Sequence, residues 1–240
     1  MARVPLRHSL VVLAGVLALA GAPVAWALDP YEKGREYFDA DDFGAVRVAW
    51  LPLARAGDLR AIAGLNQLFY WKGAAEAEIA ELTALTMHAA APPENWQAQF
   101  ELAYLHLRGH GVARDLDTGM EILRLAAVRG GGDGMFKLGA MYEGGSIIPQ
   151  DFGLARGWYE RAAAAGSYAA AWSLGDIYIA ARGVPRDDFL AYKWYYLAGL
   201  LAPRGERRNE ALRAADDVGL SLSREEIAEA RRQARLLRTD

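Results

Sequence analysis

Three groups of residues in this 240-residue sequence have types and spacing that could support chemistry: two histidines, three evenly spaced aspartates and a run of arginines. His106 and His110 are four residues apart, which can place two metal ligands on one face of a helix. The sequence offers no evident third ligand, and His110 stands among glycines. We therefore interpret both histidines as structural or surface residues and predict no metal site.

The aspartates Asp115, Asp151 and Asp187 are spaced 36 residues apart. Carboxylates that cooperate in acid–base catalysis must lie within several Å of each other, whereas this spacing places them on successive structural units. An aspartate that comes just before an apolar helical pattern is typical of an N-cap, whose side chain accepts a backbone N–H. We predict helix capping and no catalytic residue, since the sequence also has no nucleophile elbow, HExxH motif or phosphate-binding loop.

The last predicted helix is basic because it carries Arg231, Arg232, Arg235 and Arg238. A basic helix can attach to a membrane surface or to an acidic partner; we favour the polar outer face of a helix that caps the fold. The formal net charge of the chain is -3 and no long basic run occurs, so the electrostatic footprint of a nucleic-acid-binding protein is missing. The absence of cysteine excludes disulfides, thiolate metal sites and a cysteine nucleophile.

The elements that would carry these residues repeat at intervals of 36 residues. In each unit, apolar residues recur at helical spacing on both sides of a glycine-containing loop, which predicts a helical hairpin. A lone hairpin cannot bury its apolar face, so we expect an all-α fold, an α/α solenoid of about four stacked hairpins. The repeated positions assigned to the structure are Leu102, Leu138, Gly139, Tyr142, Trp158, Leu174, Gly175, Tyr178 and Trp194.

Glycine and tryptophan have specific roles in this expected repeat. Gly139 and Gly175 interrupt a helix at a cost of up to about 1 kcal/mol relative to alanine, so we expect a neighbouring helix to pack closely there. Trp158 and Trp194 should fill the space between the second helices. Positive φ angles are expected where the first helices end, at Gly109, Gly111, Gly145 and Gly183.

The segments "AAWSLGDIYIAARGVPRDDFLAYKWYYLA" and "GMFKLGAMYEGGSIIPQDFGLARGWYERAAAAG" resemble the Sel-1-like repeat family, which is related to tetratricopeptide repeats. The segment "AQFELAYLHLRGHGVARDLDTGMEILRLAAVRG" is similar, with Ala103, His106 and Ile122 in place of the family's Gly, Tyr and Trp. This resemblance implies a scaffold that binds other proteins. We predict no cofactor.

The N-terminal segment has the layout of a secretory signal peptide. Arg3 and Arg7 precede a short apolar run, and an A-x-A cleavage site follows at 25–27. We predict that residues 1–27 direct secretion across the inner membrane, to a bacterial periplasm, and are removed. The alternative is an uncleaved N-terminal anchor.

The remaining chain divides by its repeat pattern. Ser223 and Glu226 predict a capping box at the start of the closing helix. The expected segments are N-terminal capping helices at 28–60, a degenerate repeat at 61–97, repeats at 98–133, 134–169 and 170–205, and C-terminal capping helices at 206–240.

Variable side chains on the first helix of each hairpin predict a binding surface. They face away from the repeated core positions and differ in type from repeat to repeat, as expected of a concave face that recognises a protein or peptide. An ordinary solvated surface is the alternative. The predicted partner-binding residues are Gln67, Trp71, Glu101, Tyr104, Arg108, Lys137, Ser173 and Asp176.

We therefore predict an exported, non-enzymatic scaffold, monomeric or weakly associated, that binds an unidentified protein or peptide in an envelope complex or regulatory circuit. One alternative is a β-lactamase-like hydrolase, because some cysteine-rich members of the family are described as such. This chain has no cysteine and no positioned nucleophile. The other alternative is a protein that binds cell-wall glycan.

Overall fold

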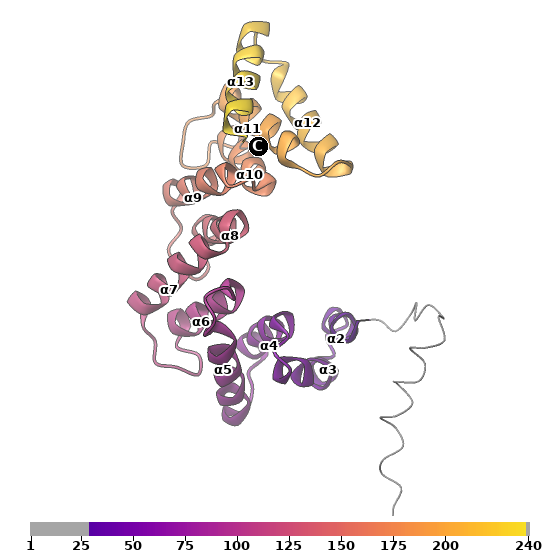
Figure 1. Cartoon of the computed structure of the whole chain (residues 1–240), viewed down its shortest axis with the longest axis vertical. Coiled ribbons are helices and arrows are strands. Elements are labelled where there is room, and N and C mark those ends of the chain that lie inside the picture. The colour runs from indigo at the N-terminus through magenta and orange to yellow at the C-terminus, as the bar shows by residue number, and fades with distance from the viewer. Residues whose placement is uncertain (1–28, 239–240) are drawn as a thin grey trace, which may run out of the picture. The chain divides into compact units, whose positions relative to one another are not determined.

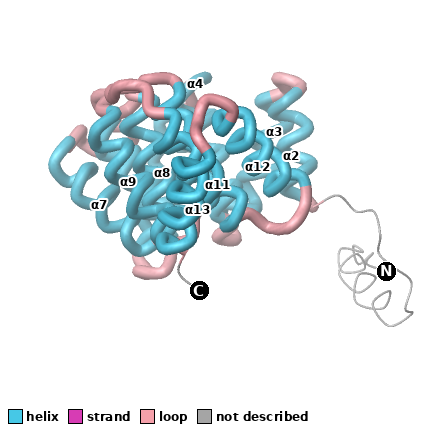
Figure 2. The backbone as a smooth tube through the Cα atoms, turned by 90° about the horizontal axis from the view of Figure 1, so that it is seen from above, coloured by secondary structure: helices cyan, strands magenta, loops and turns pink. Residues whose placement is uncertain are grey.

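The computed structural model describes residues 29–238, and all regular elements within this range are helices (Figures 1 and 2). The expectation of an all-α chain is thus confirmed for these residues. The predicted signal peptide, residues 1–27, lies outside the described part of the chain. The chain forms two compact units, with the boundary after Trp50.

The first unit contains α2 (Pro30–Asp39) and most of α3 (Phe43–Arg55). Its centre is Trp50, whose indole Nε1 donates a 3.0 Å hydrogen bond to the backbone oxygen of Tyr31. The two rings stack with centroids 5.1 Å apart. Gly34 lies against the same indole, and a Cβ at this position would clash with it.

The second unit consists of four helical hairpins followed by two closing helices. The first helices of the hairpins lie next to one another, α4 against α6 and α8 against α10, and each packs on the second helix of its own hairpin. The hairpins are α4 (Leu59–Lys72) with α5 (Glu76–Ala90), α6 (Trp96–Arg108) with α7 (Leu116–Arg129), α8 (Gly131–Gly144) with α9 (Phe152–Ala164), and α10 (Tyr168–Ile179) with α11 (Asp188–Leu201); α12 (Glu206–Gly219) and α13 (Arg224–Leu237) close the unit.

The repeated aspartates begin the second helices, as predicted. The side chains of Asp115, Asp151 and Asp187 each accept a backbone N–H three residues ahead, at 2.8–3.0 Å. The predicted capping box of α13 is also confirmed, with reciprocal bonds between Ser223 and Glu226. These caps satisfy backbone donors that a helix start leaves free.

The loop glycines adopt the predicted conformation. Gly109 and Gly145 have φ angles of 71° and 64° and end α6 and α8 in the left-handed region. Gly111 and Gly183 also have positive φ. The chain can therefore turn sharply between the helices of a hairpin.

Gly139 and Gly175 allow close packing within the hairpins, as expected. A Cβ on Gly139 would lie 2.7 Å from the ring of Tyr159 in α9, and one on Gly175 would lie 2.5 Å from the ring of Tyr195 in α11. Each tyrosine ring thus occupies the space that a side chain on the facing helix would need.

The remaining repeated positions differ in burial. Leu138 and Leu174 have no exposed surface. Tyr142 and Tyr178, four residues after these leucines, are also buried, and so is Trp194. Leu102 and Trp158 are only half-buried. Trp158 lies at the edge of the core, with the guanidinium of Arg161 4.3 Å from its ring centroid.

Candidate protein-binding surface

The eight residues predicted to bind a partner all lie on the first helices α4, α6, α8 and α10, and we call this surface the A-helix face. Gln67 and Trp71 are exposed, with 64% of Trp71 accessible to solvent. The other six are half-buried: Glu101, Tyr104, Arg108, Lys137, Ser173 and Asp176. Their burial follows from contacts with neighbouring helices.

Between α6 and α8, the structure brings three of the predicted residues together. Lys137 Nζ lies 3.7 Å from Glu101 Oε1 and 5.7 Å from the ring centroid of Tyr104. The Tyr104 hydroxyl lies 3.4 Å from the sulfur of Met141. Burial raises the pKa of the Glu101 carboxyl, and the charge of Lys137 opposes this shift. The pKa of the Tyr104 hydroxyl is raised to about 12, mainly by burial and to a smaller extent by the charge of Glu101.

Between α4 and α6, aromatic side chains and an arginine form a second group. The Arg108 guanidinium lies 3.5 Å from the ring centroid of Tyr70, a cation–π contact. The ring of His110 meets Tyr70 edge-on at 6.3 Å. Tyr70 is about half exposed (48%) and neighbours the exposed Trp71, so this group offers aromatic surface to solvent.

A network of tyrosines and carboxylates joins α8 to α11, and it includes residues that the sequence analysis missed. Glu143 accepts a 2.7 Å hydrogen bond from the Tyr159 hydroxyl and forms a 2.6 Å ion pair with Arg182. Asp176 accepts a 2.6 Å hydrogen bond from the Tyr195 hydroxyl. These carboxylates therefore satisfy hydroxyls that would otherwise be desolvated without a partner.

The sequence contained a signal for the two tyrosines. Tyr159 and Tyr195 each follow a repeated tryptophan and are themselves 36 residues apart. Ser173, another predicted surface residue, also lies close enough to Tyr159 to hydrogen-bond with its hydroxyl and lower its pKa, although burial and Glu143 raise that pKa overall. Their carboxylate partners occupy different positions of the repeat, so periodicity could not have identified them.

The predicted residues thus form three separate groups along the A-helix face. Most of their polar atoms already contact neighbouring helices, which leaves the exposed Trp71 and Gln67, with the half-exposed Tyr70, as the side chains freest to meet a partner. Tryptophan, tyrosine and arginine dominate binding energy at protein interfaces. The chemistry of this surface suits recognition of a polypeptide.

The histidines do not assemble a ligand set. His106 is half-buried with an Nδ1 atom that has no hydrogen-bond partner, and His110 packs against Tyr70. Within residues 29–238, no three side chains among His, Cys, Asp and Glu are grouped to hold a metal ion. In the same range, no helix combines the length and apolar character needed to cross a membrane.

Stacked hairpins without strands in the described range define an all-α helical repeat solenoid, as predicted from the sequence. A family model described as Sel1 repeat matches residues 96–130, 132–167 and 169–202. The chain belongs to the Sel1 repeat family, whose members generally act as scaffolds for interactions between proteins.

Two solved structures are similar to this chain. A Sel1 repeat protein from Oxalobacter formigenes is 36% identical over 50% of this chain and 89% of that chain, with a TM-score of 0.39. A protective antigen present in uropathogenic Escherichia coli strains, which displays an SLR fold, is 20% identical over 87% of this chain, with a TM-score of 0.43. The match covers 52% of that antigen, about half its length. A search of curated proteins finds no match.

Proposed function

We propose that this protein is an exported, non-enzymatic scaffold that binds a protein or peptide on the A-helix face. The observation that carries the proposal is the exposed aromatic group at the junction of α4 and α6. Trp71 is largely exposed beside Tyr70, which is held by Arg108. An exposed indole on a rigid helix supplies apolar contact area at little entropic cost, which is the property of an interface anchor.

The groups farther along the face support an extended contact. Lys137 and Glu101 present opposite charges between α6 and α8, and Arg182 pairs with Glu143 beyond them. These pairs are partly exposed, so they can form polar contacts with a partner that extends along the face from the aromatic anchor. Protein interfaces commonly combine an apolar centre with polar contacts at the periphery.

Export is the second part of the proposal and rests on the charged start, the apolar run and the A-x-A sequence at 25–27. It places the scaffold in the bacterial periplasm, within an envelope complex or a regulatory circuit. Sequencing the N-terminus of the protein purified from cells should yield Leu28 as the first residue. A cytosolic product that begins at Met1 would contradict export.

The binding face can be tested by site-specific crosslinking in intact cells. A photoreactive benzophenone amino acid in place of Trp71 should crosslink a discrete partner. The matched control places the same photoreactive amino acid at Val128, which is exposed on α7, the second helix of its hairpin. This variant should give no such product. Crosslinks from position 128 alone, or from neither position, would contradict recognition by the A-helix face.

A further inference from the structure

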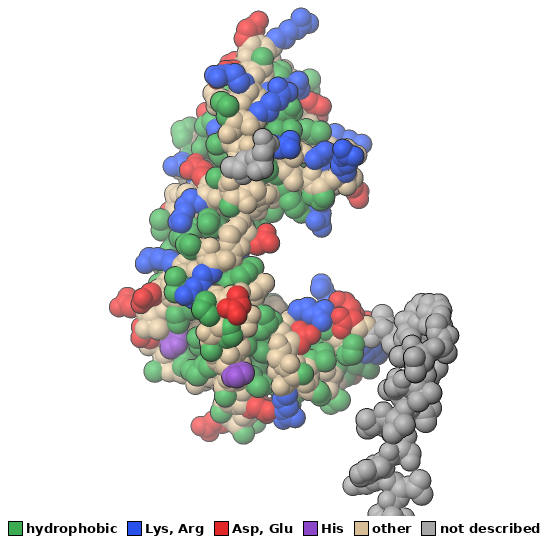
Figure 3. Space-filling model, viewed as in Figure 1, with side chains coloured by type: hydrophobic (Ala, Val, Ile, Leu, Met, Phe, Trp, Pro, Cys, Tyr) green, Lys and Arg blue, Asp and Glu red, His purple; other side chains and the backbone are tan. Residues whose placement is uncertain are grey.

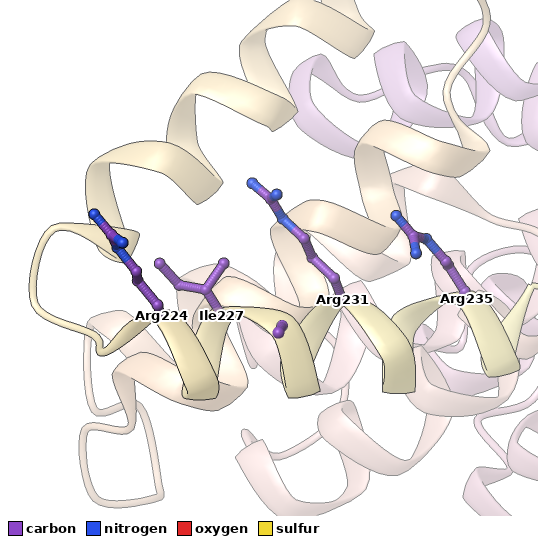
Figure 4. A pocket seen from close by; sticks show the side chains of 5 residues that line it. Arg224, Ile227, Arg231 and Arg235 are labelled. Carbon is purple, nitrogen blue, oxygen red and sulfur yellow. The ribbon is translucent and has the colours of Figure 1, made fainter.

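A groove along the last helix is separate from the A-helix face. It has a volume of about 400 Å³ and is lined by Arg224, Ile227, Ala228, Arg231 and Arg235 of α13. Figure 4 shows the three arginines and Ile227 rising from the same side of this helix. Lysine and arginine side chains gather over the C-terminal helices in Figure 3.

Two of the arginines are held in place by tyrosines of α11. Arg231 Nε donates a 2.6 Å hydrogen bond to the Tyr192 hydroxyl, and Arg235 Nη2 donates a 3.2 Å bond to the Tyr196 hydroxyl. The two tyrosine rings stack at 6.2 Å. A guanidinium has five N–H donors, so most donors remain free while the side chain is already ordered.

The groove carries an excess of positive charge. Among the described residues, Asp216 is the carboxylate that pairs with these arginines, at 3.8 Å from Arg231, and its side chain is largely exposed. Of the three acids of α13, Glu226 bonds to the backbone of Ser223, Glu229 pairs with Arg232, and Glu225 does not line the groove. Three cations and one carboxylate leave a surface that favours a negatively charged ligand.

We propose that this groove binds an extended acidic segment of a partner protein. Arg231 and Arg235 are four residues apart, which is about 6 Å along a helix. Alternate side chains of an extended chain are spaced by nearly the same distance, about 6.6 Å. Two acidic residues separated by one other residue can therefore each meet an arginine, and an apolar side chain of the segment covers Ile227.

The surroundings of α13 favour a peptide over a membrane surface. A helix that lies on a membrane needs a free apolar face to enter the lipid. The small apolar residues Ala230 and Ala234 are buried against the rest of the unit. Leu236 is exposed, but it stands alone near the end of the helix. The arginines instead line a groove of about 400 Å³.

The proposal can be tested with a fluorescent peptide that carries two Glu residues separated by one Ser, with a Leu beside them to cover Ile227, and with a matched version in which both Glu are Gln. Fluorescence anisotropy on the purified chain should show binding of the Glu peptide that weakens between about 50 and 200 mM salt. The Gln peptide should bind at least about tenfold more weakly, because charge-assisted bonds are lost. Equal binding of both peptides would overturn the proposal.

Variants of α13 locate the site. Arg231→Gln with Arg235→Gln should weaken binding of the Glu peptide by tenfold or more, and Arg224→Gln, which breaks no contact with α11, should weaken it severalfold. Arg232→Gln is the control, because Arg232 pairs with Glu229 outside the groove. Unchanged binding by both groove variants would refute the site. Binding to phosphatidylglycerol vesicles without binding to the Glu peptide would show a membrane-attachment surface instead.

Discussion

At the scale of single residues, the interiors of two hairpins, α8–α9 and α10–α11, depend on a glycine that faces a tyrosine. Gly139 leaves room for the ring of Tyr159, which is 1% exposed, and Glu143 accepts a hydrogen bond from its hydroxyl. Gly175 and Tyr195 repeat this arrangement in the next hairpin with Asp176 as acceptor. The glycine weakens its own helix, and the buried ring offsets this loss through packing.

Alanine at two glycines of one hairpin should have opposite effects. Gly139→Ala places a Cβ 2.7 Å from the Tyr159 ring, so we expect the free energy of unfolding to fall by about 1 kcal/mol after the gain in helix propensity. A Cβ added at Gly157 in α9 would have no atom within 4 Å, so Gly157→Ala should raise the free energy of unfolding by up to about 1 kcal/mol. Urea denaturation measures both, and stabilisation by Gly139→Ala would show that the glycine is not needed for packing.

Buried tyrosines should make the fold sensitive to alkaline pH. Burial, followed by the charge of Glu101, raises the pKa of Tyr104 to about 12, above its usual value of 10.0. The folded protein therefore retains a proton that the unfolded chain releases, and the associated stability, complete below pH 10, is lost as pH rises through 12. Melting temperatures between pH 9 and 12 should fall less steeply for Tyr104→Phe than for the wild type. Identical slopes would show that Tyr104 is not protected from ionisation.

At the scale of elements, the second helix of each hairpin begins at an aspartate whose side chain satisfies a backbone donor. Asp115, Asp151 and Asp187 have nearly the same backbone and side-chain geometry. This repetition fixes where each second helix starts and hence how it meets the first. The caps were predictable from the sequence because capping is a local property that needs no knowledge of the neighbouring hairpin.

A pair of neighbouring aspartates can separate capping from surface charge. Asp115→Ala should lower the free energy of unfolding by about 1 kcal/mol, because it removes the acceptor for the backbone N–H of Thr118. Asp117→Ala removes the same charge from the exposed first turn of α7 and should change stability by less than about 0.5 kcal/mol. Thermal unfolding of both variants tests this, and equal losses would argue against a specific capping role.

At the scale of the whole molecule, stability in a solenoid comes from each hairpin and its contacts with neighbours. The 36-residue period in the sequence was sufficient to predict the hairpins, the turn glycines and the buried positions Leu138 and Leu174. These features were predictable because the same local pattern occurs in several successive units.

Contacts specific to one repeat could not be predicted in this way. The buried position of Tyr159 is occupied by Leu123 in the preceding repeat, which needs no hydrogen-bond partner. Glu143 and Asp176 accept the tyrosine hydroxyls from different positions of their repeats. These pairings depend on how far side chains extend between helices. For the same reason, Tyr104 is half-buried although its position in the helical period predicted an open surface.

The most direct test of the scaffold's binding face compares two tryptophans. Trp71→Ala should weaken binding to the partner crosslinked at position 71 by about thirtyfold, the loss expected for an anchor worth about 2 kcal/mol, while the melting temperature stays nearly unchanged. Trp194→Ala is the folding control, since Trp194 is 6% exposed and its removal should cost about 3–5 kcal/mol of stability. For both variants, partner affinity is measured by calorimetry and stability by a circular dichroism melt. Normal partner affinity in a well-folded Trp71→Ala protein would contradict recognition by the A-helix face.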